Sequence, residues 1–337
     1  MPGAAPIGGF FGLDPAAADA PGAPDFGEGH TLLFWNARAA LAHLLATLDV
    51  KRVWLPAYIC TAAADAAARD GREVRFYGVG GDLRPDAAGL SGNLRTGDAV
   101  LGVDYFGTAA ERLPNLAQRF PDLVWIQDRA QGLWPDPQPW GTHVIYSPRK
   151  VIGAPDGGAL VSRGVALPPP VWAPDVNPGR LEPAHLRAAD PDGRDNAAWY
   201  AAYQAAEAAM TCEPLPMSAL SRAVAADADG PAIAERRRAN AEALLDAVGA
   251  AALFPSERLL AAAPLGVPVL TRDAAMASQR MAEQRIFCAR HWAQLPSPAV
   301  DFPAEHALAQ RLLTLPCDQR YVAADMARVV AAFRRCA

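Results

Sequence analysis

The sequence predicts an α/β fold, in which a large domain on a mostly parallel β-sheet is followed by a smaller C-terminal α+β domain. Short, continuous apolar runs recur through the first half of the chain, and helical patterns follow them, which is typical of parallel strands covered on both faces. A proline-rich passage at residues 165–183 interrupts this rhythm, and the segment 266–335 then gives a strand–helix–strand pattern with further helices. A chain of 337 residues is long enough for both domains.

The first 30 residues are rich in glycine, proline and alanine, and we expect them to form an irregular arm. The apolar runs that follow predict strands at residues 31–35, 52–56, 73–77, 98–107, 123–128, 143–147 and 158–162. Helical patterns lie between them at residues 36–48, 59–71 and 109–120. These elements make up the large domain, to which we assign residues 31–225.

Beyond the proline-rich passage, the periodicity predicts long helices at residues 196–210 and 232–248. A strand at 266–270, a helical run at 274–288, a mixed run at 306–316 and a last helix at 322–335 complete the chain. We assign residues 226–337 to the small C-terminal domain and residues 1–30 to the N-terminal arm.

Composition argues against several classes of function. A net charge of −5 argues against a general affinity for nucleic acid or for an anionic membrane. The one dense basic run, at residues 235–240, is interpreted as a solvated helix face. The 5 cysteines form no CxxC pair and the 6 histidines show no ligand spacing, so no metal site is expected. The sequence lacks a signal-peptide pattern and a membrane-spanning run, which favours a cytoplasmic protein.

Lysine is rare in this chain: of its 31 lysines and arginines, only Lys51 and Lys150 are lysines. Lys150 stands in "YSPRKVIGAPDGG", ahead of a turn rich in glycine, proline and aspartate. A desolvated lysine amine can lose its proton and attack a carbonyl to form a Schiff base, whereas an arginine guanidinium cannot. The alternative interpretation of Lys150 is a solvated cation on a loop.

Four polar stretches follow strands of the predicted sheet, where ligands gather beyond the carboxyl ends. A helix begins after Asn36, so the N–H groups of Ala37 and Arg38 suit a phosphate; the alternative is that Asn36 is only a helix cap. Asp128 ends a strand, three residues before Gln131, and is placed either to hold a protonated ring nitrogen or to form an ion pair with the adjacent Arg129. The other two stretches are Ser147 with Lys150, and the turn at residues 156–158. Together these groups match the needs of pyridoxal phosphate (PLP).

The same stretches, in the same order, resemble the DegT/StrS family of PLP-dependent sugar aminotransferases, which has the aspartate aminotransferase-like fold type I. The family's "SGTAAL", "EDAAQ" and "SFYPTKNLGAYGDGGAVV" appear here as "NARAAL", "QDRAQ" and "IYSPRKVIGAPDGGALV". The likeness runs from about Leu32 to Arg335. It implies that Lys150 and Asp128 are catalytic, that Asp128 contacts the pyridinium nitrogen, and that Gln131 lies near the ring hydroxyl. It also implies a homodimer.

The chain departs from the family pattern at three places. Ser147 is expected to replace the serine that the family usually has five residues before the lysine. Cys60 aligns with the aromatic residue that stacks on the cofactor, so we expect Tyr58 or another residue to cover that face. The segment "CEPLP" at Cys212–Pro216 replaces the family's "GYNYR", whose asparagine reaches the phosphate across the dimer.

These observations predict an aminotransferase that moves an amino group from glutamate to a keto-sugar nucleotide through a Lys150 Schiff base. PLP is the expected cofactor, and the expected partners are a small-molecule amino donor, a keto acceptor and a second copy of the chain. Two alternatives stay open. One is a PLP-binding relative that acts on a non-sugar ketone. The other is a non-catalytic binding or regulatory homologue.

Overall fold

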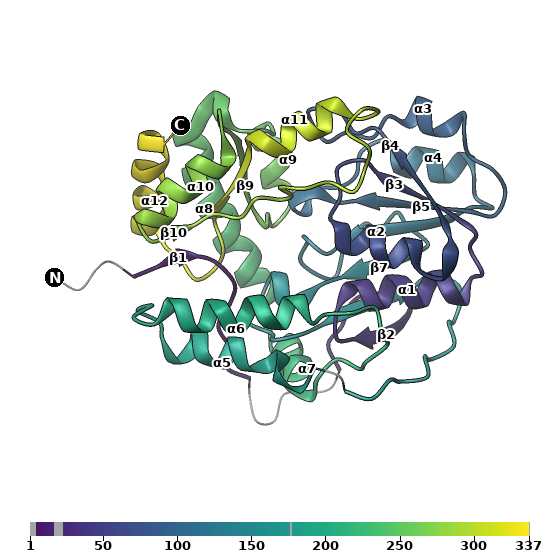
Figure 1. The fold of residues 1–337 in the computed structure, drawn as a ribbon, viewed down its shortest axis with the longest axis horizontal. Coiled ribbons are helices and arrows are strands. Elements are labelled where there is room, and N and C mark those ends of the chain that lie inside the picture. The colour runs from purple at the N-terminus through teal and green to yellow at the C-terminus, as the bar shows by residue number, and fades with distance from the viewer. Residues whose placement is uncertain (1–4, 17–22, 176, 337) are drawn as a thin grey trace.

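The computed structural model describes residues 5–16, 23–175 and 177–336, and its largest sheet has seven strands in the order β2-β8-β7-β6-β5-β3-β4 (Figure 1). The strands are β2 (His30–Phe34), β3 (Arg52–Pro56), β4 (Glu73–Tyr77), β5 (Asp98–Val103), β6 (Val124–Arg129), β7 (His143–Tyr146) and β8 (Gly158–Ser162). Only β8 runs antiparallel to its neighbours, β2 and β7. The prediction of an α/β fold with a mostly parallel sheet is confirmed.

The reversal of β8 gives the sheet one functional edge. The carboxyl ends of β2, β3, β5, β6 and β7 all lie at this edge, and β8 begins there. All four polar stretches identified in the sequence follow strands that end at this edge, or precede the strand that begins there.

Helix α1 (Ala37–Thr47) begins where β2 ends, because Asn36 caps it. Oδ1 of Asn36 accepts a hydrogen bond from the backbone N–H of Ala39 at 2.8 Å. Leu41, Leu44 and Leu45 recur at helical spacing and are buried, which stabilises the helix by roughly 2 kcal/mol for each leucine. Helix α2 (Thr61–Ala68) lies beside α1 in front of the sheet (Figure 1).

The remaining helices of the first half are short. Helix α3 (Ala87–Ser91) precedes β5, and α4 (Leu113–Arg119) covers only part of the predicted helix 109–120. The predicted helix begins late because Arg112, with φ at +75°, is not helical and Pro114 lies in the first turn. Short 3₁₀ turns in this half include η1 (Arg69–Gly71) and η2 (Tyr105–Gly107). Two more follow in the second half, η4 (Pro178–Leu181) and η5 (Gly249–Ala251).

Three helices connect the two halves of the chain: α5 (Glu182–Ala189), α6 (Asn196–Ala208) and α7 (Ala219–Ala226). Helix α6 confirms the predicted helix 196–210. The sequence does not predict helix α5, because the prolines of the preceding passage interrupt the helical pattern. Pro183 instead occupies the first turn of α5, where a proline removes no helical hydrogen bond.

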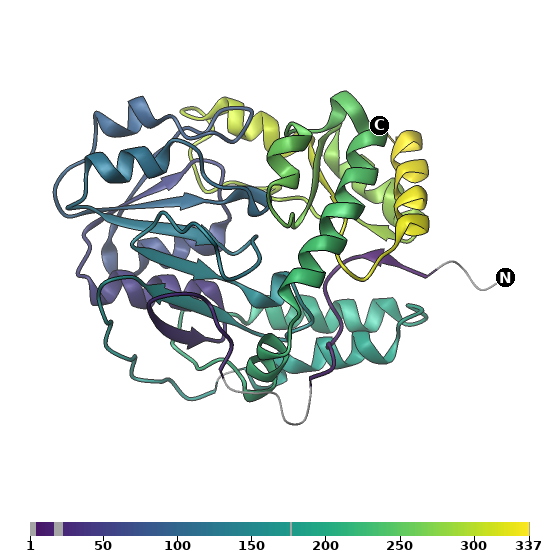
Figure 2. The same ribbon diagram turned by 180° about the vertical axis from the view of Figure 1, so that it is seen from behind.

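The C-terminal part consists of α8 (Gly230–Val248), α9 (Ser256–Leu260), β9 (Gly266–Leu270), α10 (Ala274–Glu283), β10 (Ile286–Phe287), α11 (Pro303–Arg311), β11 (Leu312–Pro316) and α12 (Ala323–Cys336). Strand β11 pairs antiparallel with β9. Figure 2 shows α8, in green, running from the neighbourhood of α7 up to this second sheet. The runs 274–288 and 306–316 each divide into a helix and a strand.

The arm is not wholly irregular. Its residues Ile7 and Gly8 form strand β1, which pairs in parallel with β10 near the other end of the chain. Farther along, Asp14 and Gly153 exchange two hydrogen bonds, from Asp14 N to Gly153 O at 3.0 Å and from Gly153 N to the Asp14 carboxylate at 2.7 Å. Parts of the predicted arm, residues 1–4 and 17–22, lie outside the described residues. The division into an arm at residues 1–30, a large domain at 31–225 and a small domain at 226–337 stays a prediction.

The basic run at residues 235–240 is only partly a solvated face. Arg236 and Arg238 are exposed on α8, as expected, but Arg237 is 1% exposed and Asn240 is 3% exposed. The interpretation was wrong for these two residues, because α8 packs one face against the rest of the C-terminal part. In the described part of the chain, no helix is both long and apolar enough to cross a membrane.

A close backbone approach fixes the start of α1, and it can be tested at Gly158. A Cβ added to Gly158 would lie 2.3 Å from the carbonyl carbon of Asn36. We expect Gly158→Ala to lower the free energy of unfolding by about 3 kcal/mol, because the cap of α1 and strand β8 must move apart. Urea denaturation measures the change. Gly81→Ala is the control, because an added Cβ there meets nothing within 4 Å.

Candidate active site

Lys150 stands in a tight turn that follows β7. The turn is the 3₁₀ helix η3 (Pro148–Lys150), and the backbone N–H of Lys150 donates to the carbonyl of Ser147 at 3.0 Å. Val151 then donates to the carbonyl of Pro148 at 2.8 Å. Ser147 is buried and Lys150 is half-buried. The turn therefore holds Lys150 at the carboxyl edge of the sheet.

A small cavity of about 70 Å³ lies at this edge. Most of the predicted site residues line it, and these are Ala37, Arg38, Cys60, Asp128, Ser147 and Lys150. They come from the start of α1, the segment after β3, the end of β6 and the turn after β7. The structure thus brings together residues that are spread over more than 100 positions of the sequence.

Asp128 is oriented by its own backbone. Its Oδ1 accepts a hydrogen bond from the N–H of Ala130 at 2.9 Å. Burial raises the pKa of the Asp128 carboxyl above its ordinary value, and the charge of Lys150 and the Ala130 hydrogen bond oppose this rise. An additional cationic group near Asp128 would favour its charged form.

Two predicted residues, Tyr58 and Gln131, line neither this cavity nor its larger neighbour. The Tyr58 ring is buried, and its hydroxyl donates to the backbone carbonyl of His291. Gln131 is also buried, and its Oε1 accepts a hydrogen bond from the N–H of Phe106 at 2.6 Å. This bond fixes the amide so that Nε2, which is buried, has no partner among the described residues. The cofactor contacts expected for both residues stay predictions.

The turn before β8 is anchored by a buried carboxylate. Asp156 is fully buried and accepts hydrogen bonds from Arg180 Nε and Ser218 Oγ, both at 2.9 Å. The N–H of Gly157 donates to the carbonyl of Trp35 at 2.7 Å, directly before the cap of α1. The aspartate of the turn is therefore structural: it fixes the position of the α1 start.

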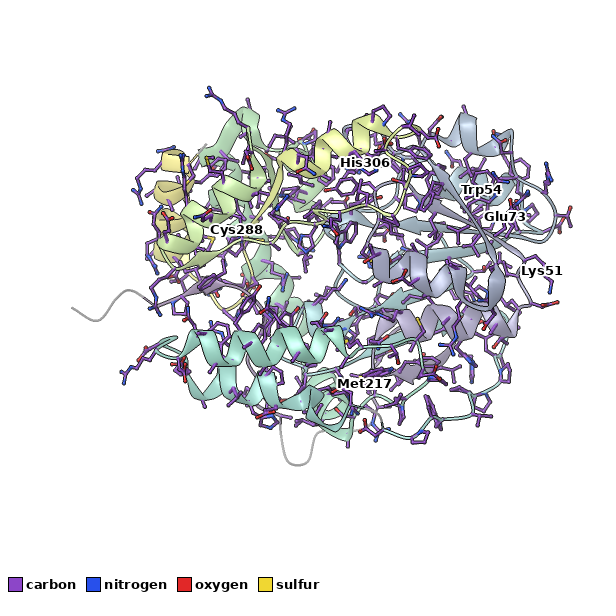
Figure 3. All side chains as sticks on the ribbon, in the orientation of Figure 1. Lys51, Trp54, Glu73, Met217, Cys288 and His306 are labelled. Carbon is purple, nitrogen blue, oxygen red and sulfur yellow. The ribbon has the colours of Figure 1, made fainter. Side chains whose placement is uncertain are left out.

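A larger cavity of about 510 Å³ adjoins the small one. Five residues line both cavities: Arg38, Cys60, Ala62, Arg149 and Lys150. The outer walls come from the arm at residues 8–11, from α6, and from residues 287–292 of the C-terminal part. Lys51, in contrast, has an 80% exposed side chain and lies far across the molecule from Cys288, which lines the larger cavity (Figure 3).

Sequence reasoning missed an ion pair in the cavity wall. Arg149 Nη1 and Nη2 donate to the two carboxylate oxygens of Glu207, at 2.6 and 3.3 Å. Burial works to lower the pKa of Arg149, but the Glu207 carboxylate and the Tyr203 hydroxyl outweigh it, so that pKa is raised. No local pattern links η3 to α6, and the two residues are 58 positions apart. Nothing in the sequence alone could have identified this pair.

His291 contributes a neutral imidazole to the larger cavity. Its Nδ1 lies 2.9 Å from Oγ1 of Thr314. Burial, together with the charge of Lys150, lowers the pKa of His291 to about 3. Among the described residues, no group of three or more His, Cys, Asp or Glu side chains could hold a metal ion.

The segment at Cys212–Pro216 packs against its own chain. Trp35 donates from its backbone N–H to the carbonyl of Leu215 at 3.0 Å, and from its indole Nε1 to that of Glu213 at 2.8 Å. Phe34 forms an isolated antiparallel bridge with Pro216. Residues 213–216 therefore extend the edge of the large sheet next to β2.

The chain has the fold type I architecture that several solved aminotransferases share. Spr1654 of Streptococcus pneumoniae, assigned as a sugar aminotransferase and solved in its PLP form, matches with a TM-score of 0.70 at 14% identity, over 98% of each chain. DesI, solved in the presence of its TDP-sugar product, matches with a TM-score of 0.67 at 20% identity, over 92% of this chain and 81% of DesI. DesV of S. venezuelae, solved with a ketimine intermediate, matches with a TM-score of 0.65 at 17% identity, over 92% and 85% of the chains.

These likenesses establish the fold predicted from the sequence. No protein-family model matches the chain, and no curated protein matches its sequence.

The neutral His291 makes stability depend on pH. A folded-state pKa of about 3, against about 6.5 in the unfolded chain, means that only the unfolded state binds this proton between those values. Above pH 6.5 the neutral His291 costs no stability. As the pH falls from 6.5 toward 3, protonation of the unfolded state lowers the free energy of unfolding. When the pH is lowered from 7.5 to 5, we expect the free energy of unfolding of His291→Gln to fall by roughly 2 kcal/mol less than that of the wild type. Urea denaturation at both pH values measures this.

The matched control is His185→Gln, because His185 is exposed on α5. An equal loss of stability in the wild type and in His291→Gln would contradict the neutral state of the half-buried His291.

Proposed function

We propose that this chain is a PLP-dependent aminotransferase of the DegT/StrS type, which moves an amino group from glutamate to a keto-sugar nucleotide. The observation that carries the proposal is the set of groups around the small cavity. Lys150, Asp128 and the start of α1 line it together. They are respectively a lysine amine, a carboxylate and a helix N-terminus, which is the set of protein groups that PLP requires.

When bound, PLP supplies an aldehyde that bonds to a lysine amine and a ring that withdraws electrons from the substrate carbon. Lys150 is placed to hold the aldehyde, because its side chain lines both cavities. When the amino donor is bound, the free Lys150 amine would be the base that takes the proton from the donor's α-carbon. Lys51 is exposed and paired with Asp49 at 2.6 Å, so it is not a competitor.

Asp128 would hold the ring nitrogen in its protonated form. Its carboxylate is oriented by Ala130, and a protonated ring nitrogen would offset the burial that raises its pKa. The start of α1 and Arg38 line the same cavity and suit the phosphate. The Arg38 guanidinium is held there by a hydrogen bond to the carbonyl of Met210 at 2.6 Å. Ser147 lines the same cavity and supports this assignment.

The buried amide of Gln131 lines neither cavity, and its contact with the ring hydroxyl of PLP is part of this proposal. Its Nε2 is a donor without a partner among the described residues, and an unsatisfied buried donor costs about 1–3 kcal/mol. The ring hydroxyl of PLP is an acceptor of the kind that Nε2 needs. The larger cavity, at about 510 Å³, has room for an acceptor beyond the cofactor. We further propose that the enzyme is a cytoplasmic homodimer.

Absorption spectroscopy tests the proposal. We expect purified protein to develop a visible band with PLP, and we expect Lys150→Ala to lose it while Lys51→Ala keeps it. Glutamate should bleach the band, because the amino group passes to the cofactor. Absence of any band in the wild type would contradict the enzyme and favour the non-catalytic alternative.

Asp128→Asn separates cofactor binding from turnover. We expect this variant to keep the band but to bleach on the order of 100-fold more slowly, because the ring nitrogen loses its charged partner. A bleaching rate like that of the wild type would contradict the role of Asp128. If an amino donor bleaches the band but the protein transfers no amino group to keto-sugar nucleotides, the alternative of a non-sugar ketone as acceptor would be favoured.

A further inference from the structure

Arg237 buries a guanidinium away from solvent. The residue lies on α8 and is 1% exposed. Among the described residues, its hydrogen bonds go only to neutral acceptors: Gln319 Oε1 at 2.8 Å, and the carbonyls of Val151 at 2.9 Å, Pro264 at 3.0 Å and Leu265 at 3.4 Å. In the described part of the chain, no carboxylate forms a salt bridge with it, and the nearby Asp318 pairs with Arg320 at 2.8 Å.

Burying a guanidinium without a charged partner lowers the free energy of unfolding. A buried charge is costly unless it is well paired, and an apolar side chain of similar volume often serves stability as well or better. Burial lowers the pKa of Arg237 below its ordinary value, although the charge of Asp318 opposes this. Packing alone therefore does not account for a guanidinium at this position.

The hydrogen bonds of Arg237 form a closed cycle around one backbone carbonyl. The carbonyl of Val151 accepts from Arg237 Nη2 at 2.9 Å and from Gln319 Nε2 at 2.8 Å. Arg237 Nε donates in turn to Gln319 Oε1 at 2.8 Å. Each member of the cycle restrains the other two, because the guanidinium and the amide are planar groups. Val151 is the residue directly after Lys150.

The other bonds of this segment leave it little freedom. Ile152 donates to the carbonyl of Pro148 at 3.0 Å, and Gly153 is held by Asp14 of the arm. The cycle adds the restraint on the peptide that links Val151 to Ile152. Arg237 itself lines the larger cavity, with Lys150 and His291.

We propose that Arg237 and Gln319 are positioning residues for Lys150. They hold the carbonyl of Val151 so that the Lys150 amine stays in the cavity that it shares with Asp128. The restraint comes from the C-terminal part, so the position of the lysine depends on how α8 and the segment after β11 pack against the turn. The benefit to catalysis rests on the proposed function, but the restraint itself does not.

Hydrogen exchange of the cofactor-free full chain tests the restraint. We expect Gln319→Leu and Arg237→Met to speed amide exchange at residues 151–153 by about tenfold, with the strands of the large sheet unchanged. Arg238→Met is the control, because Arg238 is the exposed neighbour on α8 and donates to the carbonyl of Ala262 at 3.1 Å, away from residues 151–153. Unchanged exchange at residues 151–153, or an equal increase throughout the chain, would overturn the proposal.

The rate of covalent bond formation with PLP tests the consequence for Lys150. We expect Gln319→Leu to slow the appearance of the visible band by about tenfold, because the amine is no longer held in place. The ammonium of Arg237→Lys can still donate to the Val151 carbonyl. The band should therefore appear faster in Arg237→Lys than in Arg237→Met. A rate within twofold of the wild type in Gln319→Leu and Arg237→Met would overturn the positioning role.

These two experiments keep the hypotheses apart. A wild-type protein that forms no band refutes the proposed function, while the exchange data still decide whether the cycle restrains the turn. If Arg237→Met fails to fold, Gln319→Leu and Arg237→Lys still test the restraint.

Discussion

The close contact between the turn before β8 and the start of α1 determines where a cofactor could bind. This contact exists because β8 runs against the direction of its neighbours, so that it begins where β2, β6 and β7 end. Gly158 has no side chain to separate it from Asn36, and the carboxylate of Asp156 fixes the turn through Arg180 and Ser218. The helix N-terminus, Asp128 and Lys150 then necessarily face one small cavity.

Two layers of support surround that cavity. The inner one is local: the cap at Asn36, the Ala130 hydrogen bond to Asp128 and the short turn at residues 148–150 each follow from neighbouring residues. The outer one is made of long-range contacts, in which α6, α8 and the arm reach residues 149–153. The inner layer sets which groups are present, and the outer layer restrains the segment that carries the lysine.

The sequence predicts the inner layer well and the outer layer poorly. Continuous apolar strands and the cap at Asn36 are local signals, and the carboxyl ends of parallel strands must meet at one edge, so six of the eight predicted site residues line one cavity. The pairing of β1 with β10 and the Arg149–Glu207 ion pair depend on tertiary packing, which leaves no periodicity to detect. Arg237 shows what a local pattern cannot predict. The run of arginines that contains it looks like a solvated helix face, and only the packing of α8 buries this one residue.

The central claim is that Lys150 carries the cofactor, and the scarcity of lysine allows a direct test. The protein would be incubated with PLP, reduced with borohydride and digested, and the phosphopyridoxyl group would be located by mass spectrometry. The account predicts the label on the peptide that contains Lys150 and none on the peptide that contains Lys51. A label on Lys51, or equal labelling of both lysines, would contradict it.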